Sequence, residues 1–289
     1  MMIERLGVVG CGLMGGSFAL AARAHGLVRE VVGYSPSAST RAAALAHGVI
    51  DRAVDHASDA MNQADMVLLA VPVAATAHCM ALAEQALAPH ALLMDVGSTK
   101  ADVVQMAQQH LGARQANFVP CHPIAGSERA GVAHAQANLY LDRRVILTPE
   151  PATAEDAVNR AQTVWQALGA RVTRMSPAAH DAAFAAVSHV PHLLAFAYML
   201  GMIGQPEFDP WLRLAGPGFG DFTRIAASDP TLWRDVLLAN RTQVLAQTQA
   251  FEQALSTLTQ CLAQQNADGL HQLLCQARDA RGQWTLRAD

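Results

Sequence analysis

The chain has 289 residues, a length that fits two domains of ordinary size. Hydrophobic residues make up 52% of it and charged residues only 15%, so it can bury a large core and intrinsic disorder is excluded. The net charge of −4, without a run of like charges, excludes the extended basic surface of a nucleic-acid-binding protein. Lys100 is the single lysine, so any chemistry that requires a lysine has one candidate.

Cysteine usage and the first residues indicate the compartment. The five cysteines are scattered and include no CxxC pair, which is typical of a reducing cytosol rather than of a disulfide framework. Residues 1–5 lead straight into a strand-like run, without the layout of a signal peptide. No stretch approaches the ~20 uninterrupted apolar residues of a membrane helix. We therefore expect a cytoplasmic protein that binds neither nucleic acid nor membrane.

Residues 1–176 alternate short β-rich runs with Ala-rich helical stretches. The runs over 66–71 and 91–96 are apolar at consecutive positions, as in strands that helices cover on both faces. The pattern predicts a Rossmann-type, doubly wound parallel sheet. The predicted strands cover residues 5–10, 30–34, 65–71, 91–96, 117–121, 144–148 and 171–175. The predicted helices cover residues 14–25, 38–47, 74–88, 101–111 and 155–168.

After Pro177 the strand signals stop, and residues 177–289 are predicted to form an all-helical second domain. Breaks are expected at residues 204–206, 216–220 and 229–230. Residues 232–263 predict one long helix, whose apolar positions step by four and three residues. These positions are Val244, Phe251, Leu255, Leu258 and Leu262, with Thr248 filling the gap. A core-facing stripe and a subunit interface both fit this seam.

A glycine motif, GCGLMG at residues 10–15, follows the first predicted strand. The glycines of a GxGxxG motif provide a tight turn, a close approach of backbone to pyrophosphate and close helix–strand packing. A turn that binds no ligand is the alternative, but the motif stands between a strand and a helix. We therefore predict a dinucleotide site that includes Gly10, Gly12, Leu13, Met14 and Gly15.

The end of the second strand bears on the choice of cofactor. NAD-binding proteins carry an acidic residue here, whereas this chain has Ser35, followed by Ser37, Thr40 and Arg41. Hydroxyls and a guanidinium do not repel a 2′-phosphate, so the sequence favours NADP over NAD, with a solvated helix face as the alternative for Arg41. The cofactor contacts predicted outside the glycine motif are Ser35, Thr40, Arg41, Val71, Pro72 and Lys100.

Polar runs follow at four further places. DVGSTK (95–100) and HPIAGSE (122–128) come after strands, where open α/β sheets bind ligands. SHVPH (188–192) and GFGDFTR (218–224), with SDP and WRD shortly after, interrupt the helical half. In this order after the glycine motif, the runs resemble the prephenate and arogenate dehydrogenases of tyrosine biosynthesis. The resemblance extends essentially end to end.

The resemblance implies an NAD(P)-dependent oxidative decarboxylation, in which prephenate becomes 4-hydroxyphenylpyruvate. His122 is the implied proton acceptor for the ring hydroxyl, because imidazole titrates near working pH. Ser98, together with Lys100, is expected to orient the imidazole or to line the nicotinamide pocket, with a helix N-cap as the alternative for Ser98. Arg224 is expected to clamp a substrate carboxylate, with an ion pair to Asp221 or Asp229 as the alternative.

Other residues in these runs are implied to contact the small-molecule substrate. They are Ser127, Glu128, Ser188, His189, His192 and Trp233. His189 and His192 have the spacing of a metal pair, but no Cys or carboxylate cluster completes a site, so no metal is predicted. A core position is the alternative for Trp233. The seam and the resemblance together predict a homodimer through the helical domain.

Three other functions compete with this prediction. An arogenate dehydrogenase would form tyrosine directly, and the sequence shows no evident carboxylate for its substrate's ammonium group. A β-hydroxyacid dehydrogenase shares the glycine motif but relies on a catalytic lysine in its helical domain, and no lysine follows Lys100. A non-catalytic NADP-binding sensor would not need so many polar residues in the helical half.

Overall fold

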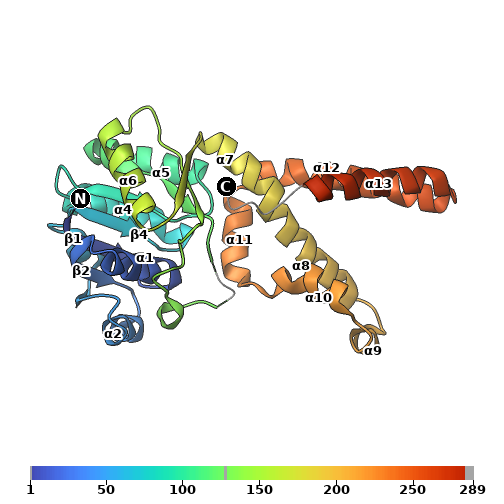
Figure 1. Cartoon of the computed structure of the whole chain (residues 1–289), viewed down its shortest axis with the longest axis horizontal. Helices are drawn as coiled ribbons and strands as arrows, with labels where there is room; N and C mark the ends of the chain where they lie inside the picture. Colours follow the sequence, from blue (N-terminus) through green and yellow to red (C-terminus); the bar gives the residue numbers. More distant parts are fainter. Residues whose placement is uncertain (1, 127–128, 284–289) are drawn as a thin grey trace.

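The computed structural model describes residues 2–126 and 129–283, which form an α/β part followed by a helical part (Figure 1). The change of architecture falls after β9 (Arg171–Arg174). Ser176 then caps α7 (Pro177–Phe184) by accepting the N–H of Ala179 at 3.2 Å. The predicted succession of an α/β and a helical architecture is confirmed.

Six parallel strands form the main sheet in the order β3-β2-β1-β4-β5-β6. The strand order reverses between β1 and β4, and open sheets bind ligands at the carboxyl ends beside such a reversal. The strands are β1 (Ile3–Val9), β2 (Val28–Tyr34), β3 (Arg52–Val54), β4 (Met66–Leu69), β5 (Leu92–Asp95) and β6 (Phe118–Val119). The helices that connect them are α1 (Leu13–Ala24), α2 (Ala38–Ala46), α3 (Ala57–Met61), α4 (Val73–Ala86) and α5 (Ala101–His110), with a 3₁₀ turn at Gly112–Asn117. The sequence did not predict β3 and α3, because so few residues carry little periodic signal.

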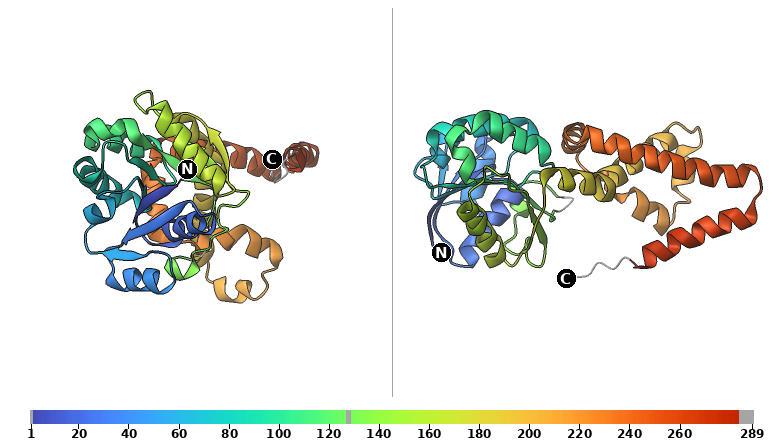
Figure 2. Two further views of the ribbon diagram at one scale, coloured as in Figure 1. Left: turned by 60° about the vertical axis from the view of Figure 1, so that its left-hand side comes forward. Right: turned by 90° about the horizontal axis from the view of Figure 1, so that it is seen from above.

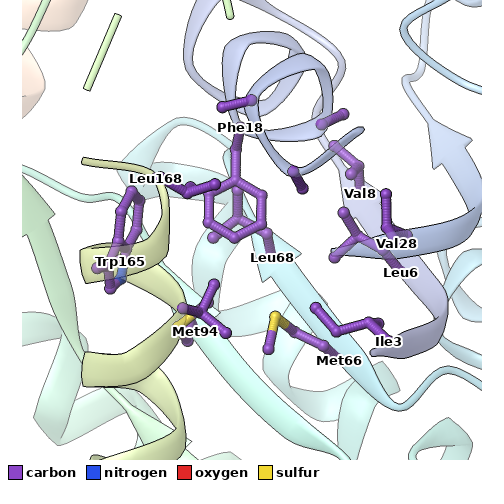
Figure 3. Close-up of a cluster of buried hydrophobic side chains, with 14 of the residues drawn as sticks. Ile3, Leu6, Val8, Phe18, Val28, Met66, Leu68, Met94, Trp165 and Leu168 are labelled. Carbon is purple, nitrogen blue, oxygen red and sulfur yellow. The ribbon is translucent and has the colours of Figure 1, made fainter. Parts of the chain in front are cut away.

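Each face of the sheet has its own core, because successive strand residues point to opposite faces. Met66 and Leu68 of β4 belong to a cluster that includes Phe18 of α1 and Trp165 of α6 (Glu155–Ala167). The rings of Phe18 and Trp165 meet edge to face with centroids 5.0 Å apart (Figure 3). The intervening residues of β4 pack against α3, α4 and α5. Because both faces of the sheet are covered, the carboxyl ends of its strands are the place where a ligand can bind.

The single strand predicted over residues 117–121 is wrong, because the chain changes sheets at Pro120. Proline has no N–H for a strand ladder, and the carbonyl of Pro120 accepts the N–H of Thr148 at 3.0 Å. Beyond it, β7 (Cys121–Pro123) pairs antiparallel with β8 (Arg144–Leu147), which pairs parallel with β9. The parallel sheet therefore ends at β6, and a 3₁₀ turn (Val132–His134) lies between β7 and β8.

One continuous helix carries the chain from the α/β part into the helical part (Figure 1). It consists of α7, a π-helical turn (Ala185–His189) and α8 (Val190–Ile203). By length and composition alone, Pro177–Ile203 could cross a membrane, because an 18-residue window within it has a mean hydropathy of 1.5. The helix also carries three histidines and an aspartate, and two of these polar residues are central to the site described below.

The long helix predicted over residues 232–263 is wrong at one residue. α11 (Pro230–Ala239) and α12 (Arg241–Ala263) are separated by Asn240, which is buried. The Asn240 amide donates to the carbonyl of Asp181 at 2.8 Å and lies 3.1 Å from Nδ1 of His189. These contacts with α7 and the π-helical turn hold Asn240 in place and fix the break. The remaining helices are α9 (Phe208–Leu212), α10 (Pro217–Thr223), a 3₁₀ turn (Arg224–Ala227) and α13 (Ala267–Gln283).

The helices α12 and α13 extend away from the α/β part as an antiparallel pair (Figure 2). Of the predicted seam, Val244 is buried at the base of α12. Farther along, Phe251, Leu255 and Leu262 are 39%, 47% and 60% exposed. Most of the seam is therefore not a core stripe of this chain.

Candidate active site

The glycine motif forms the turn between β1 and α1. Gly10 has a φ of +105°, and a Cβ there would lie 2.2 Å from the carbonyl oxygen of Ala70. A Cβ at Gly15 would lie 2.1 Å from the Gly10 oxygen, so the helix packs directly against the turn. At Gly12, by contrast, no atom of the described residues lies within 4 Å of the Cβ position.

This open space at Gly12 fits a dinucleotide. Gly12 is the N-cap of α1, and within the described residues its first turn has neither a side-chain cap nor an acidic residue. The N–H groups of that turn are the donors that a pyrophosphate requires. The residues present therefore fit NAD(P).

A cavity of about 490 Å³ begins at this turn and reaches the helical part. Its volume is that of a typical ligand site. The predicted site residues that line it are Gly12, Leu13, Met14, Val71, Pro72, Ser98 and His122. The helical part closes it with Asp229, Thr231, Leu232, Asp235 and Val236. Sequence reasoning singled out the SDP and WRD runs but assigned Asp229 and Asp235 no place in the cavity.

Lys100 does not line this cavity, which corrects the prediction that it contacts the cofactor. Its side chain is fully buried, and its ammonium pairs with Asp95 at the end of β5 and donates to the carbonyl of Cys121 at 2.8 Å. Asp95 also accepts the N–H of Cys121 at 2.9 Å. The pair thus holds both backbone groups of the residue before His122 and fixes the start of β7.

His122 is buried and lines the cavity. Burial lowers the pKa of its imidazole well below the usual value of 6.5, and the nearby charges of His180, Lys100 and His189 act in the same direction. The ring is therefore neutral at physiological pH, as a proton acceptor must be. Its Nδ1 lies 2.8 Å from Nε2 of His180.

His180 and Asp181 are site residues that sequence reasoning missed. Nδ1 of His180 lies 2.7 Å from Oδ1 of Asp181, and the ring of His180 stacks on Phe184 with centroids 4.4 Å apart. Since 58 residues separate His180 from His122, no local spacing connects them. The one signal was a His-Asp pair inside an apolar helix, where a buried polar pair needs a partner.

The N-cap role considered for Ser98 is not what the structure shows. Lys100 is the N-cap residue of α5 and makes no side-chain capping bond within the described structure. Instead, the Asp181 carboxylate accepts the N–H groups of Lys100 and Ala101, both at 2.9 Å. Ser98 lines the cavity with His122, and its orienting role stays a prediction.

The residues predicted to bind substrate form a second group beside α11. The rings of His192 and Trp233 stack with centroids 3.5 Å apart, and Trp233 is 6.2 Å from the ring of His189. Burial lowers the pKa of His192, and the charge of Arg224 lowers it further. The 3₁₀ turn that begins with Arg224 packs against α8, which carries His192. In the described structure, Ser188, His189, His192, Arg224 and Trp233 do not belong to the lining of the 490 Å³ cavity.

The predicted adenosine-side residues lie at the end of β2. Arg41 donates to the carbonyl of Ser35 at 2.6 Å and pairs with Asp55 at 2.6 Å. The hydroxyl of Ser37 accepts the N–H of Thr40 and caps α2. These bonds place the Arg41 guanidinium beside Ser35 rather than on a purely solvated helix face.

Ser127 and Glu128 lie outside the described residues. Within residues 2–126 and 129–283, no group of three or more His, Cys, Asp or Glu side chains is arranged to hold a metal ion.

An open α/β sheet with a dinucleotide turn and a neutral histidine on one cavity defines the class of NAD(P)-dependent dehydrogenases. The family follows from comparison with known proteins. The family model "Prephenate dehydrogenase, nucleotide-binding domain" matches residues 18–174, and "Prephenate dehydrogenase, dimerization domain" matches residues 176–276. The chain belongs to the prephenate dehydrogenase family.

Individual relatives agree with this assignment. Cyclohexadienyl dehydrogenase of Zymomonas mobilis is 34% identical over 97% of this chain and 96% of its own length. Prephenate dehydrogenase from Aquifex aeolicus, solved with hydroxyphenyl propionate and NAD+, is 34% identical and superimposes with a TM-score of 0.91 over 97% of this chain and 98% of its own. Synechocystis arogenate dehydrogenase is 28% identical, with a TM-score of 0.83 over 98% and 100%.

Proposed function

We propose that this chain converts prephenate to 4-hydroxyphenylpyruvate by oxidative decarboxylation, with NAD(P)+ as the hydride acceptor. One observation carries the proposal: the neutral imidazole of His122 lies on the same cavity as the open turn at Gly12. The proposed proton acceptor and the nucleotide-binding turn therefore line the same cavity. The Aquifex aeolicus relative, which binds NAD+ and a hydroxyphenyl compound, supports the same chemistry.

The reaction requires few chemical groups from the protein. The bound cofactor supplies the acceptor for the hydride that leaves the hydroxyl-bearing ring carbon. His122 accepts the hydroxyl proton, the ring carboxylate departs as carbon dioxide, and its bonding electrons complete the aromatic ring. The proton then returns to the phenolic oxygen of the product. Because aromatisation drives the reaction, the chemical task of His122 is limited to accepting the proton of the ring hydroxyl and returning it.

Arg224 is proposed to orient the substrate by binding one of its carboxylates. The packing of its 3₁₀ turn against α8 supports this role, because α8 carries His192, whose ring stacks on Trp233 of α11. Very tight binding of the departing ring carboxylate would stabilise the ground state and oppose decarboxylation. An orienting clamp is therefore the favoured role.

NADP remains the proposed cofactor preference, and arogenate remains the alternative substrate. The guanidinium of Arg41 beside Ser35 supports NADP, although Asp55 competes with a 2′-phosphate for it. The similarity to an arogenate dehydrogenase supports the alternative substrate. Asp229 and Asp235, which line the cavity, are carboxylates of the kind that an ammonium group requires.

A cytoplasmic homodimer through the helical part is the proposed state. The exposed seam of α12 and the match to a dimerization domain support the dimer. The same interface would cover apolar parts of Pro177–Ile203, of which only 22% is buried within the chain. A dimer surface accounts for this apolar helix without a membrane.

The test is an assay of the purified protein with prephenate or arogenate and with NAD+ or NADP+. We expect absorbance at 340 nm to rise with prephenate, and faster with NADP+ at low cofactor concentration. In His122→Asn, kcat should fall more than tenfold while substrate affinity changes little. No reduction with either substrate would refute the proposed function and favour a sensor. A strong preference for NAD+ would refute the NADP assignment.

A further inference from the structure

Three side chains form a hydrogen-bonded row that ends at the cavity. Oδ1 of Asp181 lies 2.7 Å from Nδ1 of His180, and Nε2 of His180 lies 2.8 Å from Nδ1 of His122. All three residues are buried, and His122 is the one that lines the cavity. The row therefore connects α7 in the helical part to β7 in the α/β part.

The protons of the row can be assigned from its acidic end. Burial opposes the charge of Asp181, but hydrogen bonds from His180 and the backbone N–H groups of Lys100 and Ala101 hold its pKa below the usual value. A carboxylate only accepts, so Nδ1 of His180 carries a proton. Burial lowers the pKa of His180 as well, so this ring is neutral and its Nε2 has a lone pair. Nδ1 of His122 must therefore donate to it.

This assignment leaves Nε2 of His122 without a proton. It is the remaining ring nitrogen of a residue that lines the cavity, so it is the atom available to a ligand there. The opposite tautomer would place a proton on Nε2 and point the lone pair of Nδ1 at the lone pair of His180. Such an arrangement loses a buried hydrogen bond and is therefore disfavoured.

The surrounding charges act on both rings of the row. The ammonium of Lys100 opposes a positive charge on either ring, and His189 opposes one on the ring at the cavity. The carboxylates of Asp181 and Asp95 favour a charge on the inner ring. Burial and Lys100 outweigh them, since both pKa values lie below the usual one. The row is therefore neutral apart from its carboxylate.

We propose that His180 and Asp181 are positioning residues that hold His122 in the tautomer with an unprotonated Nε2, the form that accepts a substrate hydroxyl proton. The kinetic consequence rests on the proposed function, whereas the tautomer is a property of the free protein. Without an acceptor at His180, His122 can place its proton on Nε2, where it blocks proton transfer.

Two substitutions of His180 separate positioning from packing. His180→Phe fills the space and keeps a ring against Phe184 but removes the acceptor for His122. His180→Gln supplies an amide oxygen as a replacement acceptor. We expect kcat to fall about a hundredfold in the Phe variant and about fivefold or less in the Gln variant, with KM within about twofold in both. Equal losses in the two variants, or a change in KM alone, would overturn the proposal.

NMR of the protein labelled with ¹⁵N-histidine reads the tautomer without substrate. The signals of His122 are those missing from His122→Asn. We expect the wild-type proton on Nδ1, and its movement toward Nε2 in His180→Phe but not in His180→Gln. A wild-type His122 protonated on Nε2 would overturn the proposal even in an active enzyme. A proton on Nδ1 in a protein that does not oxidise prephenate would support the row and refute the proposed function instead.

Discussion

The carboxylate of Asp181 accepts the backbone N–H of Lys100 at 2.9 Å, although 81 residues separate the two in the sequence. A residue of the helical part thereby caps α5, which follows the end of β5. Lys100 in turn holds the backbone of Cys121, next to His122. The position of His122, the proposed proton acceptor, therefore depends on the contact between the two parts of the chain.

Substitutions in the glycine turn should separate folding from cofactor binding. Gly12→Ala adds a methyl group to open space, so its melting temperature should stay within about 2 °C of wild type while KM for the cofactor rises at least tenfold. Gly10→Ala should lower the melting temperature markedly, because its Cβ meets the Ala70 carbonyl and its φ is positive. Thermal unfolding and cofactor titration check both. Normal cofactor affinity in Gly12→Ala would contradict the assigned site.

Lys100 should matter for stability more than an exposed cation does. Lys100→Met leaves the buried carboxylate of Asp95 without its cation, which should cost about 3–5 kcal/mol in the free energy of unfolding. Arg29→Ala is the control, because its ion pair with Glu4 has side chains 77% and 64% exposed and should contribute less than about 1 kcal/mol. Urea denaturation at pH 7 measures both. Equal losses would show that Lys100 is not a structural cation.

Acid should destabilise the protein partly through His189. Burial lowers the pKa of this histidine from 6.5 to about 4, so the unfolded chain binds its proton first as the pH falls. The contribution of neutral His189 to the free energy of unfolding is fully present above pH 6.5. It falls by about 3 kcal/mol between pH 6.5 and pH 4. The difference in unfolding free energy between pH 7 and pH 4 should therefore shrink in His189→Gln. An undiminished difference would argue against a buried neutral His189.

The seam on α12 should control the oligomeric state. Leu255→Asp places a charge on the exposed apolar face, where it would be buried in a dimer, so light scattering should show the mass of a monomer. Thr257→Asp lies on the opposite side of the helix and should leave the dimer intact. A wild-type protein that scatters as a monomer would refute the proposed interface.

Arg224 should affect substrate binding more than the chemical step. Arg224→Ala removes the proposed carboxylate clamp, so KM for prephenate should rise at least tenfold while kcat falls less. Arg213→Ala, an exposed arginine after α9, serves as the control and should leave both constants near wild type. Initial rates over a range of prephenate concentrations measure the difference. An unchanged KM in Arg224→Ala would exclude the clamp.

Some features follow from the sequence by itself, because they depend on residues close together in the chain. Consecutive apolar runs indicate buried parallel strands, and the GxGxxG spacing indicates the dinucleotide turn. The order of the polar runs identified the family, and the imidazole of His122 suggested the proposed proton acceptor. The open space at Gly12 and the cavity beside His122 agree with those local signals.

Other features were decided only by tertiary structure, because they join residues far apart in the chain. The role of Lys100 changed from a cofactor contact to a buried cation, since its charge is satisfied by Asp95 and a distant carbonyl. The break at Asn240 depends on an amide that bonds to α7, against the helical periodicity around it. Likewise, His180 reaches His122 only after the two parts of the chain pack together. The hydrophobic periodicity of a segment indicates which of its side chains face the core. Which distant residue such a side chain contacts is determined only by the packing of the whole fold.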